Sequence, residues 1–311
     1  MNSIEQNLVM DAPNLAPEAK TTAATVQAPK LGASSSLQLH WPEYLMEAAL
    51  LGAFMVSACI FGTLLGHSGS PAARAIPDGL PRRLLMGLAM GLTAVALIYS
   101  PWGRRSGAHL NPATTLTFWR LGKVAGPDAA WYVLAQALGG IAGILAAALF
   151  IGPALADPAV HYVATTPKPG GVTPAFLAEA GMTFVLMTVV LRVSNTARLA
   201  AYTGIFAGAL VATYIAIESP VSGMSMNPAR SLASAVPAGS WEALWIYFVA
   251  PPIGMLLAAE LYVRRYGLAR VFCAKLHHDT QSRCIFRCRF ADMQTKRPLL
   301  KCTAGAATRA A

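Results

Sequence analysis

The sequence predicts an all-α membrane protein with six transmembrane helices and two re-entrant half-helices arranged as an inverted repeat. Three observations support this prediction: an apolar composition, six apolar stretches long enough to span a bilayer, and two copies of one decapeptide. Hydrophobic residues make up 55% of the 311 residues and charged residues only 12%, whereas about 25% of a typical soluble domain is charged. The chain is long enough for several spans of about 20 residues each.

The six apolar stretches are expected to form the spans, and they run over about residues 43–65, 82–100, 128–152, 175–192, 199–217 and 241–263. Two shorter apolar pieces, 112–121 and 228–236, each follow an Asn-Pro-Ala tripeptide and are too short to cross. A short segment that starts with proline at the same place in each half indicates a re-entrant half-helix and a site near the bilayer midplane. Because each half has three spans, the second half enters the membrane from the opposite side, and the repeat is inverted.

The repeated decapeptide occupies residues 106–115 and 222–231, and five of its ten positions are identical in the two copies. Its centre is Asn111-Pro112-Ala113 in one copy and Asn227-Pro228-Ala229 in the other. Asn caps a helix with its side-chain oxygen, and Pro at the first helical position gives up no hydrogen bond. The unpaired N–H groups of a helix start carry partial positive charge. Two such helix starts among the spans are therefore suited to handling a polar species inside the bilayer.

The two ends of the chain differ from its apolar centre, which predicts three regions: 1–40, 41–266 and 267–311. Residues 1–40 are rich in Ala, Pro, Ser and Thr and lack the basic start and apolar core of a secretory signal, so a disordered tail is expected. The net charge is +10, and 11 of the 24 basic residues lie from Arg264 onward. The positive-inside rule then places both termini in the cytoplasm. This distribution argues against nucleic acid as a partner.

The paired Asn-Pro-Ala tripeptides, with Arg230 after the second, resemble the major intrinsic protein family, the aquaporins and glycerol facilitators. The resemblance covers about residues 42–266. Its other matching features are Glu47, Glu179, Gln136, Gly139-Gly140 and the run Pro251-Pro252-Ile-Gly254. It implies a plasma-membrane homotetramer whose subunits each hold a pore for water or small uncharged solutes, with no cofactor for transport. No nucleophile or metal-ligand cluster accompanies the two glutamates, so an enzyme is not expected.

The resemblance also assigns roles to residues along the pore. Asn111 and Asn227 would meet near the pore midpoint and donate from their amides to passing water, which interrupts proton transfer along the water file. Arg230 would stand in the outward constriction, repelling cations while donating to the solute. Met224 and Ile215 would occupy two further positions of that constriction.

The remaining position of the constriction, in the second span, has two assignments. Counting from Asn111 without a gap gives Gly91, and one extra residue in the loop 101–105 gives Met90. An Ile and Met lining differs from the pattern of water-specific members. A facilitator for glycerol or a similar neutral solute is therefore the close alternative to a water channel.

Glu47 and Glu179 are expected to accept hydrogen bonds from the re-entrant loops, because irregular backbone inside a membrane must be satisfied by protein. His109 has two open interpretations, lining the pore on its cytoplasmic side or bracing the loop. A secondary active transporter is the alternative from a different class, since inverted repeats and broken helices occur there too. The absence of a lone ionisable residue for a coupling ion favours a static pore.

The extension 267–311 lies outside the resemblance and carries the spacing Cys-x3-His-His-x5-Cys-x3-Cys. Its members are Cys273, His277, His278, Cys284 and Cys288, with Cys302 further on. Cys and His are the ligands of tetrahedral zinc sites, and in a reducing cytoplasm such thiols indicate metal more than disulfide. A zinc site is one hypothesis, and the alternatives are a basic tail on anionic lipids or a solvated extension.

Overall fold

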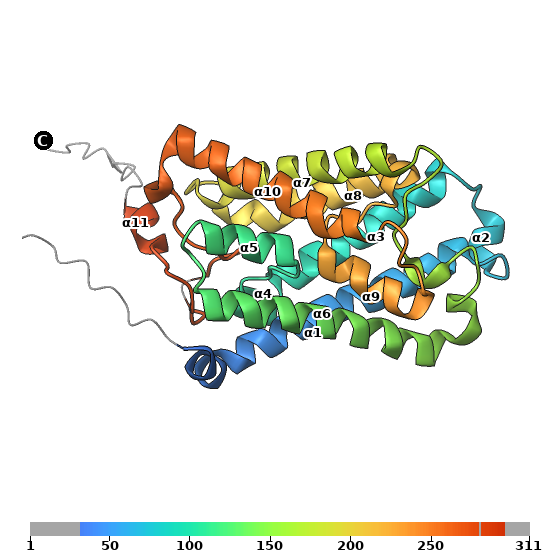
Figure 1. Ribbon diagram of the computed structural model, residues 1–311, viewed down its shortest axis with the longest axis horizontal. Helices are drawn as coiled ribbons and strands as arrows, with labels where there is room; N and C mark the ends of the chain where they lie inside the picture. The colour runs from blue at the N-terminus through green and yellow to red at the C-terminus, as the bar shows by residue number, and fades with distance from the viewer. Residues whose placement is uncertain (1–31, 280, 296–311) are drawn as a thin grey trace, which may run out of the picture. The chain divides into compact units, whose positions relative to one another are not determined.

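The computed structural model describes residues 32–279 and 281–295, so the predictions for residues 1–31, for Cys302 and for the end of the extension lie outside the described residues. All regular secondary structure in these ranges is helical (Figure 1). Six helices are long and apolar enough to cross a membrane, which confirms the predicted fold class. They are α1 (Ala33–Gly66), α3 (Leu80–Tyr99), α6 (Gly126–Ile151), α7 (Val172–Ser194), α8 (Thr203–Ser222) and α10 (Trp245–Tyr266).

Besides four 3-10 helices, the described residues contain five short α-helices: α2 (Pro71–Ala75), α4 (Pro101–Ser106), α5 (Pro112–Arg120), α9 (Pro228–Ala238) and α11 (Phe290–Thr295). The half-helices α5 and α9 begin at the prolines of the two tripeptides, as predicted, and lie between the long helices (Figure 1). Each half follows the order span, span, half-helix, span. Helices α2 and α11 mark opposite ends of the bundle, which we call the α2 end and the α11 end.

The first helix begins earlier than the sequence predicted. It starts at Ala33, so residues 33–40 are helical and the prediction of a disordered tail is wrong for them. One of their polar side chains has a partner on α6, because Asp128 accepts a hydrogen bond from His40 at 2.8 Å. Asp128 also accepts one from Tyr44, further along α1, at 2.6 Å. The apolar pattern of the span begins only after these residues, so it does not predict their helix. They are ordered instead by long-range polar contacts.

Helix pairs α1–α6 and α7–α10 pack along each other in equivalent ways, and α3 packs against α8 across the two halves. Glycines make these approaches close. A Cβ atom on Gly139 would lie 2.1 Å from the carbonyl oxygen of Ala48, and one on Gly254 would lie 2.2 Å from that of Ala180. Small residues allow membrane helices to approach in this way, so these glycines fix the helix spacing around the half-helices.

Replacement Gly139→Ala should destabilise the protein by about 1–3 kcal/mol, because an added methyl in a tight core forces the backbone to move. The expected readout is a lower midpoint of thermal unfolding for the purified protein in detergent. Gly181→Ala in α7 is the matched control, since no atom lies within 4 Å of its added Cβ. An equal response to both substitutions would contradict the packing role of Gly139.

Residues 271–279 and 281–289, here called the C-terminal segment, pack on the α11 end of the bundle. The segment is tied to the loops after α5 and α7. Arg287 N donates to Lys123 O at 3.0 Å, and Phe272 N donates to Asn195 Oδ1 at 2.7 Å. Its apolar side chains, including Phe286, join one hydrophobic cluster with residues of the bundle.

Candidate functional site

Each half-helix starts with an asparagine cap. Asn111 Oδ1 accepts a hydrogen bond from Ala113 N at 2.8 Å. Asn227 Oδ1 accepts from Ala229 N at 3.0 Å and from Arg230 N at 3.2 Å. These bonds satisfy N–H groups that a helix start leaves without a helical partner. They also fix each asparagine so that its oxygen faces its own helix and its amide nitrogen faces away.

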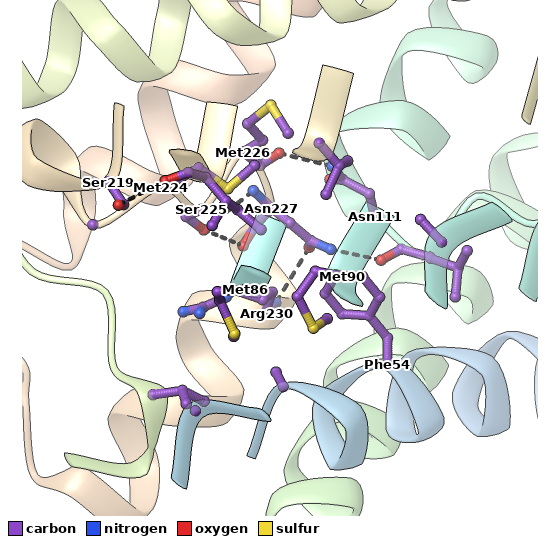
Figure 2. Close-up of a pocket in the computed structure, with 18 of the residues that line it drawn as sticks. Phe54, Met86, Met90, Asn111, Ser219, Met224, Ser225, Met226, Asn227 and Arg230 are labelled. Atoms are coloured by element: carbon purple, nitrogen blue, oxygen red, sulfur yellow. Dashed lines mark hydrogen bonds between the residues drawn. The ribbon is translucent and has the colours of Figure 1, made fainter. Parts of the chain in front are cut away.

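The two asparagines are joined reciprocally to the opposite loops. Asn111 Nδ2 donates to Met226 O at 2.7 Å, and Asn227 Nδ2 donates to Leu110 O at 2.7 Å (Figure 2). An amide NH2 has two donor hydrogens, so one N–H of each asparagine remains for a further acceptor. This crossed pair holds the two half-helices together at their N-termini.

Glu47 supports the loop before α5 with both of its carboxylate oxygens. Its Oε1 accepts from Ser106 Oγ at 2.7 Å and from His109 N at 3.0 Å, and its Oε2 accepts from Leu110 N at 2.7 Å and from Gln136 Nε2 at 2.9 Å. The carboxylate is completely buried. It provides the acceptors that an irregular backbone inside a membrane requires.

Glu179 supports the loop before α9 in the same way. Its Oε1 accepts from Ser222 Oγ and from Ser225 N, both at 2.7 Å, and its Oε2 accepts from Met226 N at 2.6 Å. Ser222 stands at the first position of the second decapeptide, as Ser106 does in the first. The repeat in the sequence is therefore a repeat of one hydrogen-bond network.

Two buried tyrosines, Tyr132 on α6 and Tyr247 on α10, complete these networks, and the sequence reasoning did not identify them. Tyr132 OH donates to Ser106 O at 2.6 Å, and Tyr247 OH donates to Ser222 O. Each tyrosine precedes a packing glycine, Gly139 or Gly254, by seven residues. That shared spacing is the signal that an alignment of the two halves would have detected.

The loops before the half-helices have unusual backbone at equivalent positions. Ala108 and Leu110 have φ of 55° and 52°, and Met224 and Met226 have φ of 54° and 58°. Non-glycine residues adopt this left-handed region at a cost of about 1–3 kcal/mol each, and they persist there only when the surroundings impose it. The two glutamates and the crossed asparagines are the contacts that impose it here.

A cavity of about 720 Å³ runs between the helices past both asparagines. At the α2 end its lining includes Asp78 and Lys168 from the connections between spans and Arg82 from the first turn of α3. Towards the α11 end it is lined by residues that include Ala108, His109 and Leu276. The site is thus a long internal passage rather than a closed pocket on one face.

Four of the residues expected at the constriction line this cavity, namely Met90, Ile215, Met224 and Arg230. Gly91 is not among the lining residues. A Cβ atom on Gly91 would lie 2.6 Å from Gly208 O on α8, so this position faces a neighbouring helix. Of the two assignments left open by the sequence, the geometry favours Met90.

Phe54 and Met86 also line the cavity, and the sequence reasoning missed both. Figure 2 places them with Met90 on the same side of the asparagine pair as Arg230. Met86 lies four residues before Met90, so it shares the same face of α3. The Arg230 guanidinium has Ser234 Oγ as a contact at 3.5 Å. The cavity wall on this side therefore combines the Arg230 guanidinium with the apolar side chains of Phe54, Met86 and Met90.

His109 is braced on all sides. One ring nitrogen, Nδ1, lies 3.0 Å from Thr115 Oγ1, and the other, Nε2, lies 2.9 Å from Ala274 O in the C-terminal segment. The ring stacks between Phe118 and Phe286, with centroid distances of 5.4 and 5.3 Å. His109 therefore lines the cavity and also ties the loop to the C-terminal segment.

Four of the five Cys and His residues singled out in the extension come together. The ligand atoms of Cys273, His278, Cys284 and Cys288 all lie within 4.8 Å of one another, so this group could hold a metal ion. Hydrogen bonds from Cys273 and Cys284 hold the pKa of the Cys288 thiol well below its usual range. His277 lies apart from the group, with its ring 4.6 Å from that of Tyr99.

Comparison with known proteins agrees with this architecture. The family model described as "Major intrinsic protein" matches residues 48–262. Aquaporin NIP1-1 from Zea mays is 32% identical over 211 residues, which cover 67% of this chain and 73% of that protein. Aquaporin Z from Photorhabdus laumondii is 30% identical over 231 residues, which cover 70% of this chain and 95% of that protein.

A solved structure shows the same fold. The aquaglyceroporin from Plasmodium falciparum superposes with a TM-score of 0.57 at 21% sequence identity, covering 72% of this chain and 95% of that one. Together with the six apolar helices, these matches make the protein a multi-pass membrane protein and confirm the resemblance found in the sequence. The chain belongs to the major intrinsic protein family and is a channel rather than an enzyme.

Proposed function

We propose that this channel is a passive pore for water and small uncharged solutes that excludes protons and ions. The observation that carries the proposal is the crossed asparagine pair in the wall of the long cavity. Asn111 and Asn227 each keep one free N–H, so a water molecule passing them accepts hydrogen bonds through its oxygen. A water oriented in this way cannot relay a proton to the next water in the file.

The positive ends of the two half-helices add to this exclusion. In aquaporin-type pores generally, the positive ends of half-helix dipoles and an arginine exclude protons and cations. Here α5 and α9 begin at the asparagine pair, and Arg230 lies in the first turn of α9. We assign Arg230 to the constriction, where its guanidinium donates hydrogen bonds to a neutral solute and repels cations.

The lining around Arg230 favours a solute with an apolar side. Phe54, Met86, Met90 and Ile215 contribute carbon and sulfur atoms to the cavity wall, and methionine adapts its shape to what it contacts. A glycerol-type neutral solute is therefore the second candidate substrate. Neither Glu47 nor Glu179 is free to bind the coupling ion of a secondary active transporter, because their oxygens accept hydrogen bonds from the re-entrant loops.

We also propose a homotetramer in the plasma membrane with both termini in the cytoplasm. The basic residues concentrated after the last span support this orientation, which makes the α11 end cytoplasmic and the α2 end external. For the Cys and His group we propose zinc as the ion, because three thiolates and one imidazole are a ligand set that zinc favours.

Stopped-flow light scattering of proteoliposomes tests the proposed function. Water permeability is measured first, followed by glycerol and a panel of other neutral solutes, on both zinc-loaded and zinc-free protein. We expect permeability above that of empty liposomes for water or for at least one neutral solute. Values equal to those of empty liposomes for every solute, in both metal states, would overturn the proposal.

A further inference from the structure

The C-terminal segment covers the α11 end of the cavity. Leu276 lines the cavity there and is 7% exposed. Its N–H donates to Gly107 O at 3.0 Å, and the neighbouring Ala274 carbonyl lies 2.9 Å from His109 Nε2. Gly107 and His109 belong to the loop that leads into α5. The segment is therefore attached directly to the wall of the passage.

A buried lysine strengthens this attachment. Lys275 is 2% exposed, and its ammonium donates to Arg104 O at 2.6 Å and to Arg283 O at 2.8 Å. One of these carbonyls belongs to α4 and the other to the segment itself. Phe286 adds an apolar contact, since its ring is stacked on His109 at an angle of 9°.

The segment has little regular structure of its own to keep it in place. Its described residues contain no α-helix and no strand, so cross-links between its parts determine its shape. The Sγ atoms of Cys273 and Cys284 lie 3.6 Å apart. Tetrahedral zinc with bonds of about 2.3 Å separates two sulfur ligands by about 3.8 Å, so the two thiols already stand at the spacing of a zinc site.

The other two ligands come from separate parts of the segment. His278 Nε2 lies 3.1 Å from Cys288 Sγ. The His278 ring is held in position by stacking on Phe290 at a centroid distance of 4.1 Å. One ion at this place would join two parts of the segment. The first part, between Cys273 and His278, carries Leu276, and the second, between Cys284 and Cys288, carries Phe286.

We infer that zinc bound by Cys273, His278, Cys284 and Cys288 locks the C-terminal segment across the cytoplasmic mouth and so closes the pore. The inference rests on the proposed pore function and adds its regulation. Binding releases the thiol protons to solvent. Shifting a two-state equilibrium from 1:99 to 99:1 requires zinc to bind the closed arrangement of the segment about 10⁴-fold more tightly than the open one. The closed arrangement brings the four ligand atoms within 4.8 Å of one another, so it is the one that zinc is expected to favour.

The metal site is tested first, on the purified full-length protein, by metal analysis together with a count of free thiols. We expect about one zinc per chain, and loss of most of it in Cys284→Ser. Cys59→Ser is the matched control, because Cys59 is buried in α1 away from the group. A wild-type protein with almost no zinc after zinc loading, or with Cys273 and Cys284 joined as a disulfide under reducing conditions, would overturn the inference.

Gating is tested by the permeability of the same protein in proteoliposomes. Stripping zinc with a chelator should raise the flux of the permeant solute about tenfold or more, and returning zinc should reverse the change. Leu276→Gly should conduct with zinc still bound, and Cys284→Ser should conduct irrespective of zinc. The chelator experiment needs no variant, so it remains decisive even if a variant folds poorly.

The possible outcomes separate this inference from the function on which it rests. Equal, high permeability of zinc-loaded, zinc-free and Leu276→Gly protein would overturn gating while leaving the pore intact. Permeability at the level of empty liposomes in all three would overturn the pore itself. Closure that depends on zinc in wild type and in Cys59→Ser, but not in Cys284→Ser, is the expected result.

Discussion

Arg230→Ala should let monovalent cations through a pore that otherwise excludes them. A cation about 4 Å from a guanidinium is repelled by about 4 kcal/mol at an effective dielectric constant of about 20. Loss of that repulsion corresponds to roughly a thousandfold rise in the rate of crossing. The measurement is potassium or proton flux into proteoliposomes loaded with an ion-sensitive dye.

Two further variants separate the charge of Arg230 from its size. Arg230→Lys keeps the charge and should retain most of the exclusion. Arg83→Ala removes an arginine that lines the same cavity near the start of α3, about two turns before Met90, and should change ion flux little. If Arg230→Ala excludes ions as well as the wild type does, the role assigned to this arginine is wrong.

Glu47→Ala should prevent most of the protein from folding into an active channel. Four donors lose their acceptor. Two of them are backbone groups inside the bundle, Leu110 N in the left-handed region and His109 N next to it. A buried donor left without a partner costs about 1–3 kcal/mol, so the two backbone groups alone cost several kcal/mol. This is comparable with the whole free energy of unfolding of many proteins, about 5–15 kcal/mol.

The equivalent change Glu179→Ala should have a similar effect, because its carboxylate supports the second loop through three bonds of the same kind. The readouts are the yield of monodisperse protein, the midpoint of thermal unfolding and the water permeability. Glu260→Ala is the control. Its ion pairs with Arg120 and Arg264 are exposed, and such pairs contribute about 1 kcal/mol or less. Wild-type behaviour of Glu47→Ala would contradict the support role.

The fold was accessible from the sequence because its strongest signals are local. A span is an apolar run of a certain length, and a half-helix start is a cap followed by proline, so each can be found within a few residues of sequence. The crossing of Asn111 and Asn227 onto opposite loops required the three-dimensional structure. It joins residues more than 100 positions apart, and neither decapeptide specifies which carbonyl the other asparagine reaches.

The cavity wall was predictable only in part, for a geometric reason. Counting from Asn111 could not decide between Gly91 and Met90, since a shift of one residue rotates a helix position by about 100°. The contact of Gly91 with α8 decides it. Phe54 on α1 had no motif near it, because an aromatic residue in an apolar span looks the same whether it faces lipid, a neighbouring helix or the cavity.

The C-terminal extension shows the limit of spacing arguments. Five candidate ligands were recognised, but adjacent His277 and His278 are equivalent by spacing alone. Their ring contacts separate them, since His278 stacks on Phe290 whereas the His277 ring is tilted by 58° against Tyr99. That the segment also covers the mouth of the cavity depends on contacts with Gly107 and His109, which no local pattern in the extension could indicate.

The most direct test of the pore is to measure water flux without any ion gradient, and proton flux under a separately imposed pH step, in the same proteoliposomes with zinc-free protein. Water moves under an osmotic step followed by light scattering, and protons are followed with an entrapped pH-sensitive dye. A passive pore with an intact asparagine pair should give rapid osmotic flux with proton flux no higher than that of empty liposomes. Proton flux that rises in parallel with water, or solute movement that occurs only with an imposed ion gradient, would contradict the account.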